Sequence, residues 1–264
     1  MDIRNALQAR GIRPSKRMGQ YFLTDQEVVA RMVAYAAVGS EDEVLEIGAG
    51  TGSVTEALDR TAKRVYAVEK DAELCALLRD RFGHASSRTT IMEGDVLSME
   101  LPHCAKVVAS IPFQVSSPLT IKLLTHEPGF AVAVLLYQQE FAEKLIARPR
   151  TKAYGRLSVV AQALAEVEQL EFVPRGAFYP PAPVKTAIVR LKARAGIEQL
   201  VADKAVFLSF VTAAFEHRRK KLKWTMAAKQ QEGVVGSVVE KRAEELSPAE
   251  FVQLATSLIE PADV

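Results

Sequence analysis

The strongest constraint on the fold of this chain is the alternation of short apolar runs with helix-length segments along its first two-thirds. The apolar runs are rich in Val, Ile and Leu and are expected as strands at residues 43–47, 64–68, 89–92, 106–109 and 131–136. The segments between them have helical spacing, as at residues 54–61, 72–82 and 119–125. Short strands separated by helices form βαβ units. The sequence therefore predicts an α/β fold around a mostly parallel, buried sheet.

The pattern changes toward the C-terminus. Residues 169–173 and 186–191 read as two further strands with only a Pro-rich loop between them, so we expect a hairpin that adds an antiparallel edge to the sheet. After Arg194 the pattern is helical, with breaks at Gly233 and Ser247-Pro248. We therefore expect three parts: a basic N-terminal arm (1–17), a large α/β domain (18–194) and a small all-helical domain (195–264).

The composition is that of an ordinary globular protein, with 48% hydrophobic and 25% charged residues. Because the net charge is only +2, any binding to nucleic acid must depend on local basic patches. The N-terminus lacks the apolar segment of a secretory signal, and no run approaches the roughly 18 apolar residues that span a bilayer. Cys75 and Cys104 have no metal-ligand spacing, so we expect reduced thiols in a cytoplasmic protein and no metal site.

A glycine-rich loop, Gly48-Ala49-Gly50-Thr51-Gly52, joins the first of these predicted strands to the helix that follows it. Glycines let the backbone pass close to a ligand, and a helix N-terminus offers free N–H groups. The spacing from Gly48 is G-x-G-x-G, and Ser53 stands where a dinucleotide site has its third glycine. The lysine of a phosphate-binding P-loop is absent as well. The loop therefore predicts a cofactor site of another kind.

Two carboxylates follow the next two predicted strands. Glu69 ends the second strand, where an acid can accept hydrogen bonds from ribose hydroxyls, and Asp95 follows the third, where it can accept from the amine of an adenine. Since the carboxyl ends of parallel strands meet at one edge of the sheet, both acids are expected beside the glycine loop. This set describes a nucleoside bound without a pyrophosphate, which fits S-adenosylmethionine better than NAD.

The fourth predicted strand leads to the tetrapeptide Ser110-Ile111-Pro112-Phe113 at the same edge. A hydroxyl and backbone carbonyls can accept hydrogen bonds from an exocyclic amine, and an aromatic ring can stack on the base that carries it. An amine acceptor site beside a methyl donor indicates methyl transfer to the amino group of a base.

Taken in order, these motifs resemble the family of ribosomal RNA adenine N6,N6-dimethyltransferases that act near the 3′ end of small-subunit rRNA. The similarity extends from about residue 14 to about residue 258. Besides the features above, it includes residues 16–23, 115–118, 178–184, 215–222 and 244–248. The resemblance implies a Rossmann-like sheet of seven strands with a small helical C-terminal domain. It also implies a monomer that works during ribosome biogenesis.

Carried over by position, the resemblance implies cofactor-binding roles for Gln20, Tyr21, Leu23, Gly48, Gly50, Glu69, Asp95 and Ser110. Gln20, Tyr21 and Leu23 would cover the methionine part of S-adenosylmethionine, with Gly48 beneath it. The catalytic residues implied at the target base are Ser110, Ile111, Pro112, Phe113 and Phe178. The chain departs from the family pattern at Tyr21, usually His or Asn, and at Ser110, usually Asn. A serine hydroxyl can still accept one hydrogen bond.

A basic segment, His217-Arg218-Arg219-Lys220-Lys221-Leu222-Lys223, is expected in the first helix of the small domain. Upstream, a stripe at helical spacing should face the core, formed by Phe207, Val211, Ala214 and Phe215. A charge run of this kind is often a solvated helix face. Beside a base-modifying site, however, we expect RNA phosphate contacts from Arg218, Arg219, Lys220 and Lys221. Further basic clusters lie on the N-terminal arm and at residues 148–152.

The expected function is S-adenosylmethionine-dependent dimethylation of adenosine N6, at two adjacent adenosines in a hairpin loop of small-subunit rRNA. One alternative is a large-subunit rRNA adenine methyltransferase of the macrolide-resistance type, which would label the other ribosomal subunit. Another is a non-catalytic assembly factor that retains the fold, an alternative left open by Ser110 and dismissed by measurable turnover.

Overall fold

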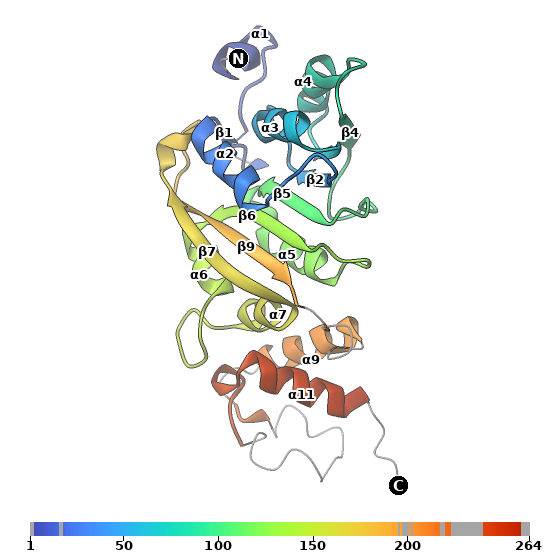
Figure 1. Cartoon of the computed structure of the whole chain (residues 1–264). Helices are drawn as coiled ribbons and strands as arrows, with labels where there is room; N and C mark the ends of the chain where they lie inside the picture. Colours follow the sequence, from blue (N-terminus) through green and yellow to red (C-terminus); the bar gives the residue numbers. More distant parts are fainter. Residues whose placement is uncertain are drawn as a thin grey trace. The chain divides into compact units, whose positions relative to one another are not determined.

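The structure is a computed structural model that describes residues 3–15, 18–194, 196, 201, 203–216, 220–222 and 240–259. The chain divides into two compact units (Figure 1). The first comprises residues 1–142 and 168–192, and the second comprises residues 143–167 and 193–264. None of the described helices is both long enough and apolar enough to cross a membrane.

The first unit is built on a seven-stranded sheet in the order β4-β3-β2-β5-β6-β9-β7. Its strands are β2 (Glu43–Ile47), β3 (Arg64–Glu69), β4 (Thr89–Glu93), β5 (Lys106–Ser110), β6 (Val132–Gln138), β7 (Ala165–Val173) and β9 (Thr186–Ala193). The pairs among β2 to β6 are parallel, whereas β9 runs antiparallel to β6. This confirms the predicted sheet with an antiparallel edge, although β7 begins four residues earlier than expected.

Helices connect the strands and surround the sheet (Figure 1). They are α1 (Ile3–Ala9), α2 (Gln26–Tyr35), α3 (Ser53–Thr61), α4 (Ala72–Phe82), α5 (Ser116–Thr125) and α6 (Gln139–Leu145), with short 3-10 turns η2 (Phe113–Val115) and η3 (Arg175–Ala177). Since βαβ crossovers are right-handed, the crossovers toward β4 put α3 and α4 on one face, and the crossover toward β6 puts α5 on the other. The direction of winding therefore reverses between β2 and β5, which is where open α/β sheets bind ligands.

A two-stranded antiparallel sheet, which the sequence did not predict, joins distant parts of the first unit. Strand β1 (Phe22–Leu23) pairs with β8 (Phe178–Tyr179), with Leu23 opposite Phe178 and Phe22 opposite Tyr179. Phe22 also packs with Leu7 and with Leu74 and its neighbours in a small apolar cluster. This pairing brings Leu23 and the residues just before it beside Phe178, and these residues line the candidate site.

The described part of the second unit contains the first three residues of β7 and is otherwise mainly helical, with α7 (Arg156–Leu164), α9 (Lys204–Glu216), the 3-10 turn η4 (Ala243–Glu245) and α11 (Pro248–Ile259). Phe207, Val211 and Ala214 are buried, which confirms most of the predicted apolar stripe. Phe215 is only partly buried, yet its ring stacks on Phe251 with centroids 5.8 Å apart.

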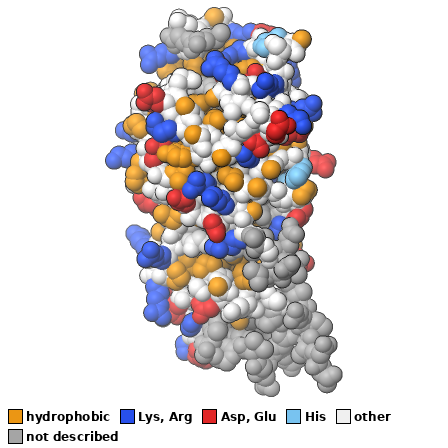
Figure 2. Space-filling view, viewed as in Figure 1, with side chains coloured by type: hydrophobic (Ala, Val, Ile, Leu, Met, Phe, Trp, Pro, Cys, Tyr) orange, Lys and Arg blue, Asp and Glu red, His pale blue; other side chains and the backbone are white. Residues whose placement is uncertain are grey.

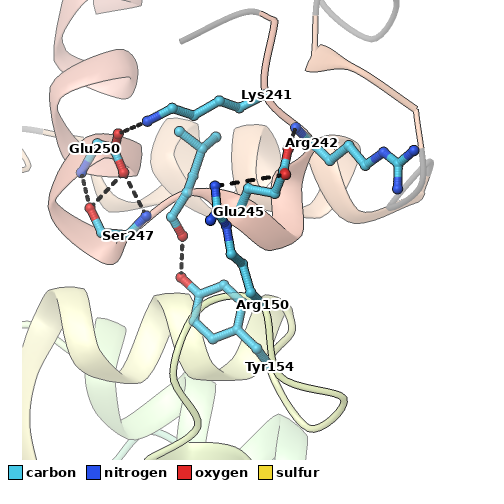
Figure 3. Close-up of polar contacts among 8 residues, drawn as sticks. Arg150, Tyr154, Lys241, Arg242, Glu245, Ser247 and Glu250 are labelled. Atoms are coloured by element: carbon cyan, nitrogen blue, oxygen red, sulfur yellow. Dashed lines mark hydrogen bonds and ion pairs between the residues drawn. The ribbon is translucent and has the colours of Figure 1, made fainter.

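The loop before α7 is attached to the segment before α11 (Figure 3). The Tyr154 hydroxyl donates to the Leu246 carbonyl at 2.7 Å, and the Arg150 N–H donates to the Glu244 carbonyl at 2.7 Å. Because of these contacts and the packing of α7 on α9 and α11, residues 143–167 group with the C-terminal helices. The predicted boundary at residue 194 differs from this grouping, which takes in the earlier helix as well.

The described part of α9 runs from Lys204 to Glu216, and residues 217–219 lie outside the described residues. The expectation that the basic segment lies within this helix is wrong for Lys220 and Lys221. Lys220 lies in a bend, and Lys221 forms an isolated bridge with Arg242. Arg218 and Arg219 lie outside the described residues.

Candidate active site

A cavity of about 260 Å³ opens at the carboxyl edge of the sheet. The predicted site residues that line it are Gln20, Tyr21, Gly48, Gly50, Glu69, Asp95, Ser110, Ile111, Pro112, Phe113 and Phe178. Leu23 instead lines a smaller cavity of about 40 Å³, together with Tyr21, Gly48 and Ser110. The structure therefore brings the predicted cofactor and base residues together, because four of the segments that bear them follow neighbouring parallel strands.

The glycine loop fits tightly against its surroundings. Gly48 has φ +72°, and a Cβ added there would lie 3.3 Å from Cδ of Pro112. Gly50 has φ +56°, and its Cβ would lie 3.0 Å from the Phe22 ring. The Val68 carbonyl accepts hydrogen bonds from Gly48 N at 2.9 Å and from Ala49 N at 3.1 Å. Left-handed backbone and close neighbours both exclude larger residues here, so the loop keeps its backbone exposed to the cavity.

Glu69 is held by backbone donors. Its Oε2 accepts from Gly50 N at 2.8 Å, and its Oε1 accepts from Lys70 N at 2.8 Å and Asp71 N at 2.9 Å. A carboxylate offers about four acceptor positions. Three are therefore occupied by the chain itself, and the position that remains is on Oε2, the oxygen next to the glycine loop. This geometry fixes the side chain and leaves an acceptor for one hydroxyl.

Asp95 lines the same cavity from the loop that follows β4. Its Oδ1 accepts from Leu97 N at 2.9 Å, and its Oδ2 pairs with Lys70 Nζ at 2.7 Å. The hydrogen bond from Lys70 is the main reason that the pKa of the Asp95 carboxyl lies below its ordinary value. Asp95 is therefore ionised at neutral pH and can act only as an acceptor.

Lys122 on α5 forms hydrogen bonds with the loop that contains Asp95. The sequence did not predict this role. Its ammonium group donates to the carbonyls of Val96 at 2.7 Å, Leu97 at 3.2 Å and Met99 at 2.5 Å. All three ammonium donors are thus used on the turn that follows Asp95. No spacing signal links a lysine to a loop more than twenty residues earlier, so only the fold reveals this contact.

The acceptor side is formed where β5 ends. Ile111 N donates to the Leu136 carbonyl at 3.2 Å, which continues the sheet by one residue. The Pro112 carbonyl accepts from Val115 N at 3.1 Å, and the Phe113 carbonyl accepts from Ser116 Oγ at 3.2 Å. Within the described part of the chain, no residue bonds the Ser110 hydroxyl or donates to the Ile111 carbonyl. Both residues line the cavity, and these two oxygens remain available as hydrogen-bond acceptors.

Aromatic side chains line the same cavity. The Tyr21 ring stacks on the Phe113 ring with centroids 5.7 Å apart and planes at 23°. Phe178 is 3% exposed and contributes to the cavity wall from β8. An apolar, aromatic wall beside two acceptors suits a flat heterocycle that carries an amine.

A family model described as ribosomal RNA adenine dimethylase matches residues 12–260. The chain belongs to this family. A protein of Methanosarcina barkeri named probable ribosomal RNA small subunit methyltransferase A is 38% identical over 252 residues, covering 91% of this chain and 86% of the relative. A protein of the same name from Thermococcus onnurineus is 37% identical over 266 residues, covering 94% and 93%.

Solved structures agree with this result. A dimethyladenosine transferase from Plasmodium falciparum has a TM-score of 0.79 and 26% identity, covering 90% of this chain and 97% of its own. The 23S rRNA methyltransferase ErmE has a TM-score of 0.66 and 28% identity, covering 90% and 100%. The predicted Rossmann-like methyltransferase fold is thus confirmed, as are the predicted activity, rRNA adenine dimethylation, and the predicted cofactor, S-adenosylmethionine.

The residues of the cavity fit this cofactor. A glycine loop that a Cβ would obstruct, a carboxylate with one open acceptor position and an ionised Asp95 are suited to an adenosine without a pyrophosphate. The roles of the individual side chains stay predictions.

Proposed function

We propose that this rRNA adenine dimethyltransferase modifies small-subunit rRNA, forming N6,N6-dimethyladenosine at two adjacent adenosines of a hairpin loop near the 3′ end. The names of the curated relatives support the choice of subunit. The observation that carries the proposal is the adjacency of Gly48 and Ser110: a Cβ on Gly48 would lie 3.6 Å from the Ser110 carbonyl oxygen. The methyl donor and the amine acceptors therefore share one cavity at the point where β2 and β5 lie side by side.

The chemical difficulty lies in the nucleophile, because the lone pair of adenine N6 is delocalised into the ring. Bound S-adenosylmethionine supplies an electrophilic methyl group on its sulfonium. The Ser110 hydroxyl and the Ile111 carbonyl accept the amine N–H groups, which draws the nitrogen toward tetrahedral geometry and directs its lone pair at the methyl donor. Positioning of this kind can remove up to roughly 7–11 kcal/mol of a barrier.

The base itself is held by aromatic contact. Phe113 and Phe178 line the cavity on the acceptor side, and stacking contributes about 1–3 kcal/mol per base. The target adenosine must leave its helix or loop stack to reach this site. After one methyl transfer a single N–H remains, so only one of the two acceptors holds the monomethylated amine during the second transfer.

Proton removal does not require a strong base in this proposal, because the proton leaves a nitrogen that methylation has already made positively charged. The acidic residues among those lining the cavity are Glu69 and Asp95, and both are engaged on the cofactor side by backbone N–H groups and Lys70. The acceptors at Ser110 and Ile111 therefore orient the amine rather than ionise it.

The proposal also covers the oligomeric state of the protein, its location in the cell and the form of the subunit on which it acts. We infer a monomeric protein of the cytoplasm that acts on assembly intermediates of the small subunit. The competing reading, a large-subunit enzyme, draws support from the similarity to the 23S rRNA methyltransferase ErmE. The higher TM-score of the dimethyladenosine transferase and the names of the relatives favour the small subunit.

The test is to offer methyl-labelled S-adenosylmethionine together with undermethylated small subunits, or with large subunits in a parallel reaction. The rRNA is then digested and the labelled nucleoside identified. We expect label in N6,N6-dimethyladenosine from the small subunit. Label confined to large-subunit rRNA would contradict the proposal, and cofactor binding without any transfer would favour a non-catalytic assembly role.

A further inference from the structure

A hydrogen bond between Gln20 and Asp71 joins the segment before β1 to the start of α4. Gln20 Nε2 donates to Asp71 Oδ2 at 2.8 Å, although the two residues lie 51 positions apart in the chain. The other polar atom of this amide is used as well, because Gln20 Oε1 accepts from Ser15 N at 2.7 Å. Since a backbone N–H donates and a carboxylate accepts, the two partners together fix the orientation of the amide.

Asp71 has two further contacts where β3 ends. Its Oδ1 accepts from Glu73 N at 3.0 Å and from Leu74 N at 3.3 Å, which caps the N-terminus of α4. Its own N–H donates at 2.9 Å to Oε1 of Glu69, the predicted ribose acid. Asp71 therefore connects Glu69, the start of α4 and Gln20.

The hydrogen-bond partners of Asp71 are neutral N–H groups rather than cations. Figure 2 shows basic and acidic side chains interspersed over one face of the molecule, and carboxylates such as those of Asp80 and Glu93 pair with arginines. Among the described residues, no lysine or arginine forms an ion pair with Asp71. Because directional hydrogen bonds to neutral donors fix a geometry without balancing a charge, this arrangement suits a positioning role.

The segment before β1 also contacts the acceptor side of the candidate active site. Residues 18–21 all line the cavity of about 260 Å³. A Cβ added to Gly19 would lie 3.7 Å from Phe113 N, and the Tyr21 ring stacks on the Phe113 ring. Since Gln20 lies between Gly19 and Tyr21, a contact that fixes Gln20 also restrains the two residues that lie against Phe113.

We propose that Asp71 is a positioning residue of this methyltransferase, which holds residues 18–21 at the cavity through Gln20 and ties their placement to the cofactor through Glu69. The inference rests on the proposed function, in particular on the placement of S-adenosylmethionine in this cavity. Without the bond between Gln20 and Asp71, cofactor binding has to order residues 18–21, and the entropy lost in that step weakens binding. Once the cofactor is bound, its own contacts hold the segment, so the effect is on affinity rather than on kcat at saturation.

The test exchanges the amide and the carboxylate in the full-length protein. Asp71→Asn keeps the cap of α4, because Asn and Asp are equally good N-cap residues, but it places an NH₂ group opposite the NH₂ group of Gln20. Gln20→Glu places a second carboxylate opposite Asp71. The double variant Gln20→Glu/Asp71→Asn restores the contact with donor and acceptor exchanged, since the new amide donates to the new carboxylate, whose other oxygen still accepts from Ser15 N.

Asp25→Asn is the matched control, because Asp25 caps α2 in the same way, accepting from Glu27 N at 3.0 Å and from Val28 N at 3.2 Å. For the wild type and the four variants, calorimetric titration gives the Kd of S-adenosylmethionine, and urea titration gives the free energy of unfolding. The kcat on undermethylated small subunits is measured with saturating cofactor.

We expect Asp71→Asn and Gln20→Glu each to bind S-adenosylmethionine about tenfold more weakly than the wild type, because each loses a hydrogen bond to a charged group. The double variant should return to within about twofold of the wild type, since the two changes are coupled through one contact. The control should bind normally, and kcat at saturation should stay within about twofold of the wild type in every variant.

A double variant that binds no better than the weaker single variant would overturn the inference. Equal losses in Asp71→Asn and Asp25→Asn would overturn it too, as would losses of affinity that follow the free energy of unfolding. If the wild type binds S-adenosylmethionine but methylates no small subunits, the proposed function fails, while the Kd values still decide the role of Asp71.

Discussion

Tyr21 stacks on Phe113, with ring centroids 5.7 Å apart and an angle of 23° between the planes. This contact joins the segment before β1 to the tetrapeptide Ser110-Ile111-Pro112-Phe113, and the two lie about ninety positions apart in the chain. Because Tyr21 covers one face of Phe113, a target base can stack only on the other face unless Tyr21 moves. The tyrosine therefore sets the orientation of the ring on which the base is proposed to rest.

Replacing Tyr21 by Ala should lower kcat/KM for undermethylated small subunits by about three- to tenfold, since an aromatic pair contributes about 0.5–1.5 kcal/mol. Tyr21→Phe keeps the ring and should stay close to the wild type. Steady-state kinetics with both variants provide the measurement. Equal losses in the two variants would show that the hydroxyl matters rather than the stacking contact.

Glu69→Gln should weaken binding of S-adenosylmethionine by at least about tenfold, because hydrogen bonds to a charged group contribute about 1.5–3 kcal/mol. The amide also places an NH₂ group where Gly50 N or Lys70 N now donates. Calorimetric titration of the cofactor measures the loss. Glu73→Gln, an exposed change in the first turn of α4, is the matched control and should bind normally. Normal binding by Glu69→Gln would remove this residue from the cofactor site.

Lys122→Met should raise the KM for S-adenosylmethionine several-fold while kcat stays near the wild-type value. The reason is that Lys122 orders the turn after Asp95 through three carbonyls and touches no reacting atom. Lys63→Met, an exposed position, serves as the comparison. If kcat falls as much as kcat/KM, Lys122 does more than position the turn that follows Asp95.

Stability should depend on pH through Glu46. This residue is 2% exposed, its Oε2 has no partner among the described residues, and burial raises its pKa from about 4.5 to about 8. Between these values the folded protein keeps a proton that the unfolded chain has lost, so the free energy of unfolding falls as pH rises through this range. Urea unfolding of Glu46→Gln should show a gain over the wild type of a few kcal/mol at pH 9 and almost none at pH 5. Parallel pH profiles for the two proteins would contradict this assignment.

The sheet could be predicted from sequence because buried parallel strands are continuous apolar runs, and β2 and α4 have the predicted bounds. The convergence of Gly48, Glu69, Asp95 and Ser110 followed from the rule that parallel strands end at one edge. The pairing of Leu23 with Phe178 could not be predicted, because two-residue strands have no detectable periodicity. Long-range polar contacts such as those of Lys122 could not be predicted for a different reason, because they depend on how the helices pack.

The basic segment at residues 217–223 is the clearest case in which a helical spacing pattern gave a wrong prediction for described residues. Its helical spacing predicts a continuation of α9, yet Lys220 lies in a bend, and Lys221 forms a bridge with Arg242 and pairs with Glu240 at 2.7 Å. That pair is half exposed, so it contributes little to stability. The proposed contact of Lys220 and Lys221 with RNA stays a prediction.

The most direct test of the account is the turnover of Ser110→Ala on undermethylated small subunits, measured with saturating S-adenosylmethionine. Loss of one of the two proposed amine acceptors should lower kcat by about ten- to a hundredfold, as expected when a buried polar group loses its partner. The Kd of S-adenosylmethionine should stay within about threefold of the wild type, and exposed Ser40→Ala should have no effect. An unchanged kcat for Ser110→Ala would contradict the central claim that this hydroxyl holds the amine that is methylated.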